Sequence, residues 1–294
     1  MSLPLLPVFA AWRQTLKAGY SFKALRGDLA AGLTVGIIAI PLAMALAIAV
    51  GVAPQYGLYT VLVAAPLIAL TGGSRFNVSG PTAAFVVILL PITQQFGLGG
   101  LLLCTMLAGL IMIAMGLGRA GRLIEFVPYP VTLGFTAGIG IVIATLQLKD
   151  LFGLSLSSQP LHYLEQVQVL LLALPSAHLG DALVAALSLA VLILWPRWVP
   201  KVPGHLAALA VGTLAGLALE ALGIPLATLG ERFSYSLDGV LHAGIPPFLP
   251  DFTWPWQLPA ANGQPLGLSF ELIRQLLAPA FAIAMLGAIE SLLC

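Results

Sequence analysis

The residues best suited to bind a small anion lie in one short run, Ser79-Gly80-Pro81-Thr82-Ala83-Ala84. Pro81 favours the first turn of a helix and disfavours helical structure in the residue before it. The first N–H groups of a helix that begins there have no partner within the helix, and they carry a partial positive charge. Ser79 could cap this helix, Thr82 could offer a hydroxyl, and the small neighbours allow close approach. The run therefore predicts an anion site, with a helix end buried only for packing as an equal alternative.

A single carboxylate, Glu290, stands deep in the last apolar segment, with no other charge between Arg274 and it. Burying a carboxylate in lipid is costly, so such acids face a cavity, pair with another group or carry a proton. We expect Glu290 to exchange a proton or to lie near a coupling cation, with Ser291 beside it as a weaker candidate. The alternative is a structural acid that forms a hydrogen bond near the end of a helix.

Pro41 interrupts the first apolar segment. A proline inside a helix removes one hydrogen bond and kinks the helix. Alone it predicts a kink that serves packing. Together with the second interrupted element at Pro81, it is typical of the midplane site of a transporter.

The composition indicates a membrane protein. Hydrophobic residues make up 60% of the chain and charged residues 8%, with a mean hydropathy of +1.03, whereas soluble domains carry about 25% charged residues. The net charge of +1 gives no sign of a nucleic-acid partner. The two cysteines, Cys104 and Cys294, fit neither a disulfide framework nor a metal site. The apolar segments hold no Ser/His/Asp cluster, histidine-rich pattern or glycine-rich phosphate loop, so we expect neither an enzyme nor a cofactor.

Apolar windows bounded by charges, glycines and prolines predict an all-α polytopic fold. The third window is too short to cross, because fifteen helical residues cover about 22 Å. We expect the chain to enter the membrane as an extended segment over Phe76–Gly80 and then to form a half-helix from Pro81. The eight expected segments are Leu29–Val50, Tyr56–Thr71, Pro81–Gln95, Leu98–Leu117, Phe126–Leu148, Asp181–Trp195, Leu206–Leu222 and Ile273–Cys294.

The distribution of basic residues predicts a cytoplasmic N-terminus. If the half-helix completes a crossing, nine lysines and arginines fall on one side and three on the other, which fits the positive-inside rule. We expect residues 1–28 to be a cytoplasmic segment with an amphipathic start around Phe9–Trp12 at the membrane surface, and residues 29–294 to form the transmembrane domain. The nine are Arg13, Lys17, Lys23, Arg26, Arg75, Arg119, Arg122, Arg197 and Lys201; the three are Lys149, Arg232 and Arg274.

Two polar excursions separate the later segments. Residues 153–180 contain an amphipathic turn around His162–Leu172. Residues 223–268 contain an alternating stretch, Phe233–Leu237, that predicts a short strand. Trp254 and Trp256 in the same excursion are expected to anchor it at the membrane interface.

Several of these motifs together resemble the SulP family of anion transporters over nearly the whole chain. The run Leu133–Thr136 and the run Met285–Leu293 resemble most closely the bacterial branch of C4-dicarboxylate transporters. The other runs that carry the resemblance are Gly32–Ala47, Pro54–Tyr59, Thr71–Arg75 and Val78–Ala84.

The resemblance implies a fold of fourteen segments in two inverted seven-segment repeats, like that of the uracil transporters (UraA-like). The anion would lie between half-helix ends of the third and tenth segments, beside the first and eighth. Carried over, the first segment contributes Pro41, Leu42 and Leu46, and the third contributes Ser79–Ala84. Glu290 falls on the eighth, where the family has an acid tied to proton or sodium coupling. The family also implies a homodimer of the full-length protein.

Two departures from the family pattern affect these expectations. Leu42 stands where many sulfate and chloride members carry glutamine, which favours a larger, partly apolar organic anion over sulfate. The sequence stops at Cys294, inside the eighth segment, so we expect a fragment without the rest of the second repeat and without the C-terminal STAS domain.

The sequence as a whole predicts a proton-coupled importer of C4-dicarboxylates (succinate, fumarate or aspartate-like) that works by alternating access in a bacterial inner membrane. The alternative is a sulfate or bicarbonate permease, driven by protons or sodium. A membrane sensor or scaffold is less favoured. The expected partners are a small organic or inorganic anion, the lipid bilayer and a second copy of the protein, with no nucleic acid.

Overall fold

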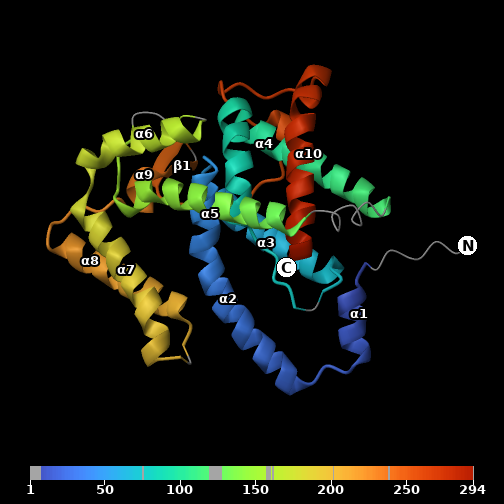
Figure 1. The fold of residues 1–294 in the computed structure, drawn as a ribbon, viewed down its shortest axis with the longest axis horizontal. Coiled ribbons are helices and arrows are strands. Elements are labelled where there is room, and N and C mark those ends of the chain that lie inside the picture. The colour runs from blue at the N-terminus through green and yellow to red at the C-terminus, as the bar shows by residue number, and fades with distance from the viewer. Residues whose placement is uncertain are drawn as a thin grey trace, which may run out of the picture. The chain divides into compact units, whose positions relative to one another are not determined.

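The computed structural model of the protein describes residues 8–74, 76–118, 128–156, 160, 162–200, 202–237 and 239–293. Within these residues, seven helical spans are long and apolar enough to cross a membrane, which confirms the all-α polytopic fold (Figure 1). They are α2 (Phe22–Ala49), α3 (Pro54–Thr71), the 3-10 turn η1 (Ala83–Phe85) with α4 (Val86–Leu117), α5 (Tyr129–Leu151), α7 (Leu179–Trp198), α8 (Gly204–Ala221) and α10 (Phe270–Leu293). Shorter helices are α1 (Ala10–Lys17), α6 (Tyr163–Ala173) and α9 (Leu229–Arg232).

The chain divides into two compact units. The first contains Met1–Gly19, Ala43–Ile143 and Phe248–Cys294, and the second contains Tyr20–Leu42 and Ala144–Pro247. Helices α2 and α5 each contribute residues to both units.

The core of the first unit lies between α4 and α10, which run side by side (Figure 1). Cys104 of α4 is completely buried, and its thiol donates a weak hydrogen bond to the Leu276 carbonyl oxygen at 3.7 Å. Ala280 and Ala284 of α10 are also fully buried. Small residues of this kind let two helix backbones approach closely in a membrane.

Helix α4 turns sharply at Gly97, whose φ of 69° and ψ of −170° are not helical. The expected break between residues 95 and 98 is therefore real, because α4 consists of two helical segments that meet at a kink at Gly97. A Cβ atom at Gly97 would lie 2.5 Å from the Ala260 carbonyl carbon, and the Gly99 N–H donates to the Pro259 carbonyl at 3.2 Å. Only glycine fits where the loop approaches so closely.

The loop that covers this turn is itself ordered by hydrogen bonds. It contains the 3-10 turn η4 (Pro255–Gln257) and a bridge between Pro259 and Pro265. The Trp254 ring stacks on the ring of Trp256 in η4, with centroids 4.9 Å apart. We call residues 255–266 the cap loop.

The second unit is built around the pair α7 and α8. The Gly212 backbone of α8 approaches the Ser188 hydroxyl of α7, which lies 2.5 Å from a Cβ position at the glycine. The expected strand is confirmed as β1 (Ser234–Leu237), which pairs antiparallel with β2 (Val240–Ala243). The expected amphipathic turn is the helix α6. The Tyr20 hydroxyl donates to Asp28 at the start of α2, and this bond is the main reason why the pKa of Tyr20 is raised.

Several sequence expectations stay predictions. The orientation rests partly on Arg75, Arg119, Arg122 and Lys201, which lie outside the described residues, as does Cys294. The division at residue 28 is not tested either, although α2 already begins at Phe22.

Candidate functional site

The structure brings together two of the residues singled out in the sequence, Thr82 and Glu290. Thr82 ends the extended segment before η1, with φ −122° and ψ 140°, and Glu290 lies in the last turns of α10. The Thr82 Oγ1 donates a hydrogen bond of 2.7 Å to the Glu290 Oε1. Both side chains are partly buried, so the contact joins the start of one membrane helix to the end of another within the first unit.

The helix start at this contact differs in detail from the expectation. Extended chain leads up to it as predicted, but the helical turn begins at Ala83 rather than at Pro81. Ser79 was expected to cap the helix, and this is wrong, because Thr82 occupies the N-cap position of η1. The Thr82 hydroxyl donates to Glu290, so no side-chain cap is present at η1 or at the start of α4. The first N–H groups therefore keep the partial positive charge that an anion would meet.

The carboxylate of Glu290 lies beside this positive helix end through its bond to Thr82. A negative charge on Glu290 would repel a second anion at this helix end. Two like unit charges about 4 Å apart repel by about 4 kcal/mol at an effective dielectric constant near 20. Neutralising Glu290 with a proton or a cation would therefore strengthen anion binding by up to about a thousandfold.

The rest of the predicted anion run surrounds this contact along the chain. Ser79, Pro81, Ala83 and Ala84 are half-buried, and Gly80 is exposed with no atom within 4 Å of a Cβ position. Ser291 is exposed. The residues at the helix start are small, as the site hypothesis requires.

The three residues expected from the first segment lie on α2, which is helical through Pro41. Pro41 and Leu42 belong to the second unit, whereas Leu46 belongs to the first. Leu42 is 49% exposed and the other two are half-buried. Whether these residues line the same site as Thr82 and Glu290 stays a prediction.

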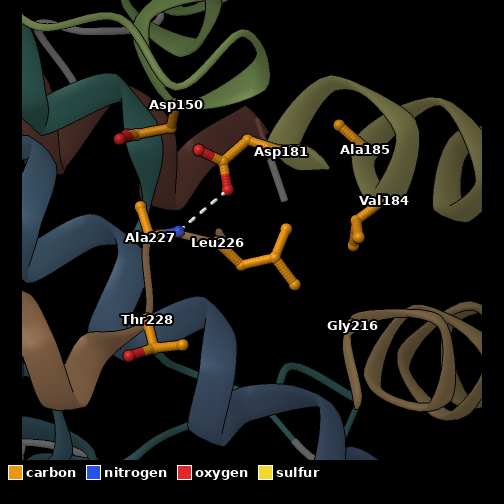
Figure 2. Close-up of a pocket in the computed structure, with 8 residues that line it drawn as sticks. All are labelled: Asp150, Asp181, Val184, Ala185, Gly216, Leu226, Ala227 and Thr228. Atoms are coloured by element: carbon orange, nitrogen blue, oxygen red, sulfur yellow. Dashed lines mark hydrogen bonds between the residues drawn. The ribbon is translucent and has the colours of Figure 1, made fainter. Parts of the chain in front are cut away.

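A second polar feature was not identified from the sequence, a cavity of about 300 Å³ within the second unit (Figure 2). The Asp181 Oδ1 accepts a hydrogen bond from the Ala227 N–H at 3.1 Å, and its Oδ2 is buried without a described hydrogen-bond partner. Asp150 forms an ion pair with Arg232 at 3.1 Å. The only sequence signal was that both acids stand next to polar excursions. Val184, Ala185, Gly216, Leu226 and Thr228 complete the lining.

The comparisons with known proteins decide the family. The sequence model described as the Sulfate permease family matches residues 25–294. The chain belongs to this family. It is 37% identical over 275 residues to YvdB of Bacillus subtilis, provisionally named a sulfate transporter, a match that covers 94% of the chain and 48% of that protein. It is 32% identical to the sodium-independent sulfate anion transporter of Bos taurus, with coverage of 93% and 46%.

A solved transporter structure has a similar fold. The transmembrane domain of a cyanobacterial bicarbonate transporter, BicA, matches with a TM-score of 0.71 and 28% identity, covering 93% of the chain and 65% of that structure. The Picosynechococcus BicA sequence is 30% identical over 66% of the chain. The expected SulP membership and UraA-like fold are therefore confirmed. The chain spans about half the length of the first curated relatives it matches.

Proposed function

We propose that the complete natural protein carrying this chain is a multi-pass membrane transporter of small inorganic oxyanions, sulfate or bicarbonate. The relatives are named as sulfate and bicarbonate transporters. This favours the permease alternative over the C4-dicarboxylate importer that the sequence first suggested, since none of these names refers to a dicarboxylate. Competition by succinate remains the way to distinguish the two.

The single observation that carries the site proposal is the hydrogen bond from Thr82 to Glu290. It places a titratable group at the uncapped start of η1, where the backbone N–H groups favour negative charge. We assign anion binding to the run Ser79–Ala84, with Pro41, Leu42 and Leu46 as further lining residues. Glu290 is the coupling residue, and Ser291 is its neighbour on α10.

The proposed mechanism follows from the competition between two negative charges for one helix end. A substrate anion is held weakly while Glu290 is ionised. Uptake of a proton or a sodium ion at Glu290 removes the repulsion, so the anion and the coupling ion bind together. Thr82 links Glu290 to the anion site. Its hydroxyl donates to the carboxylate while Glu290 is ionised, and it can donate to the anion instead when Glu290 is neutralised.

Uptake of labelled sulfate and bicarbonate by proteoliposomes containing the complete natural protein tests this proposal. We expect uptake to rise with an inward proton or sodium gradient. Glu290→Gln should abolish the response to that gradient, because glutamine cannot ionise. Thr82→Val should weaken anion binding by about tenfold, the effect of losing one hydrogen bond of about 1.4 kcal/mol, whereas Thr82→Ser should keep it.

Three outcomes would contradict the proposal. Wild-type uptake with an unchanged gradient response in Glu290→Gln would remove the coupling role. If succinate inhibits uptake more strongly than either inorganic anion does, the dicarboxylate importer would be the better-supported function. Anion binding without flux would indicate the sensor that was considered from the sequence.

A further inference from the structure

We propose that α1 is a lipid-binding helix that selects anionic phospholipids at the membrane surface. The observation behind this proposal is the distribution of its side chains around the helix axis. Successive residues of an α-helix are turned by about 100°, so residues four apart share a stripe. In α1 three such stripes differ in chemistry, and each faces different surroundings.

One stripe of α1 faces the protein. Ala11 is 4% exposed, and Thr15 in the same stripe donates its hydroxyl back to the Ala11 carbonyl at 2.9 Å. Just before the helix, the Phe9 N–H donates to the carbonyl oxygen of Thr71, the last residue of α3, at 3.2 Å. The burial of Ala11 and the bond from Phe9 to Thr71 set how α1 is rotated against the end of α3, and therefore which side chains it turns outward.

The outward stripes are apolar and basic. Trp12 and Leu16 are 50% and 54% exposed, and Arg13 and Lys17, about 100° further round, are exposed as well. An amphipathic helix with aromatic and aliphatic residues beside lysine and arginine lies in the interface of a bilayer. The apolar stripe inserts at the boundary of the acyl chains, while the long basic side chains reach the phosphates.

The charge of the surrounding sequence identifies the occupant as anionic lipid. Before Asp28 the chain carries four basic residues and no acidic residue. The positive-inside rule places this end at the cytoplasmic leaflet, whose anionic lipids attract each nearby lysine or arginine by about 1 kcal/mol, or about fivefold. The occupant we assign is therefore a phospholipid with a net negative headgroup rather than a zwitterionic one.

Quenching of Trp12 by brominated lipids tests this assignment. The complete natural protein is reconstituted into mixed bilayers of phosphatidylcholine and phosphatidylglycerol, with one lipid at a time carrying brominated acyl chains. The emission of Trp12 is isolated as the difference between the wild type and Trp12→Phe. We expect brominated phosphatidylglycerol to quench this emission several-fold more strongly than brominated phosphatidylcholine, and the preference to fall as salt is added.

The basic stripe is tested by Arg13→Gln/Lys17→Gln, which should make the two lipids equal quenchers. Gln14→Ala, an uncharged change on the same short helix, is the matched control and should keep the preference. The assignment fails if the wild type shows no preference or if the double variant retains it. It also fails if neither brominated lipid quenches Trp12, because the exposed face would then be covered by protein. None of these outcomes depends on transport.

Discussion

The main helix pairs of the two units are buried to different degrees. In the most apolar 18-residue stretches of the η1–α4 span and of α10, 33% and 28% of the residues are buried, against 6% and 11% in α7 and α8. The first unit buries small side chains between two helices and holds its polar contact, Thr82 to Glu290, within the packed region. The second unit has two polar contacts beside its cavity, which we call its polar ties: the hydrogen bond from the Ala227 N–H to Asp181 and the ion pair between Asp150 and Arg232.

This difference suggests that the two units have different roles, one holding the proposed site rigid and the other allowing its contacts to change. The proposed site, where two negative charges compete for one helix end, needs rigid neighbours, and the packed α4–α10 pair supplies them. The second unit has partly exposed polar contacts beside its helix pair α7 and α8, and these can change at little cost, because exposed ion pairs contribute only about 0–1 kcal/mol. Substitutions in the two units test the distinction.

The largest expected effect is at the covered turn of α4. Gly97→Val should lower the free energy of unfolding by about 3 kcal/mol or more, because a β-branched residue is strained at positive φ and its Cβ would overlap the cap loop. The midpoint of thermal unfolding in detergent measures this. Gly109→Ala is the control on the same helix, since its Cβ meets nothing within 4 Å. An unchanged midpoint of unfolding in Gly97→Val would show that the cap loop does not contact α4 as closely at Gly97 as the structure indicates.

An intermediate effect is expected from enlarging one alanine in each unit. Ala284→Leu, at a fully buried position of α10, should cost about 1–3 kcal/mol through overpacking. Ala190→Leu, at an exposed position of α7, should leave the midpoint of unfolding nearly unchanged. Equal losses in the two variants would remove the contrast between a packed and an open unit.

The smallest effects are expected at the polar ties of the second unit. Asp181→Ala should cost about 1 kcal/mol and speed hydrogen exchange at the Ala227 amide by up to about tenfold, because that N–H loses its acceptor. Asp181→Asn keeps an acceptor and should keep the protection. Arg232→Gln should cost less than about 1 kcal/mol. A loss at Arg232 as large as that at Gly97 would show that this unit depends on its ion pair.

Local chemistry made part of this structure predictable. Pro81 signalled that extended chain gives way to helix, because its ring limits both its own φ and the residue before it. Glycine marked the break in α4, and the structure has it at Gly97. Long uncharged runs located the spans, although the predicted boundaries moved by several residues. In each case a residue and its immediate neighbours contain the information.

Long-range contacts were not predictable in the same way. Thr82 and Glu290 were both selected, but nothing in either segment indicates that they meet across 208 residues. Ser79 was chosen as the cap because it stands just before Pro81, whereas the structure has Thr82 at the N-cap position, with its hydroxyl bonded to Glu290 of α10. The pairing of Gly97 with Ala260, and of Asp181 with Ala227, likewise depends on tertiary packing.

The buried thiol of Cys104 has a practical consequence for studying this protein. Thiol reagents act on accessible thiolates, and structural cysteines enclosed in a core are inert. Cys104 has no exposed surface and faces the Leu276 carbonyl, so it will stay unmodified while introduced cysteines react. Probes for spectroscopy can therefore be attached along α4 and α10 with Cys104 left in place, which preserves the helix packing that such probes are meant to report.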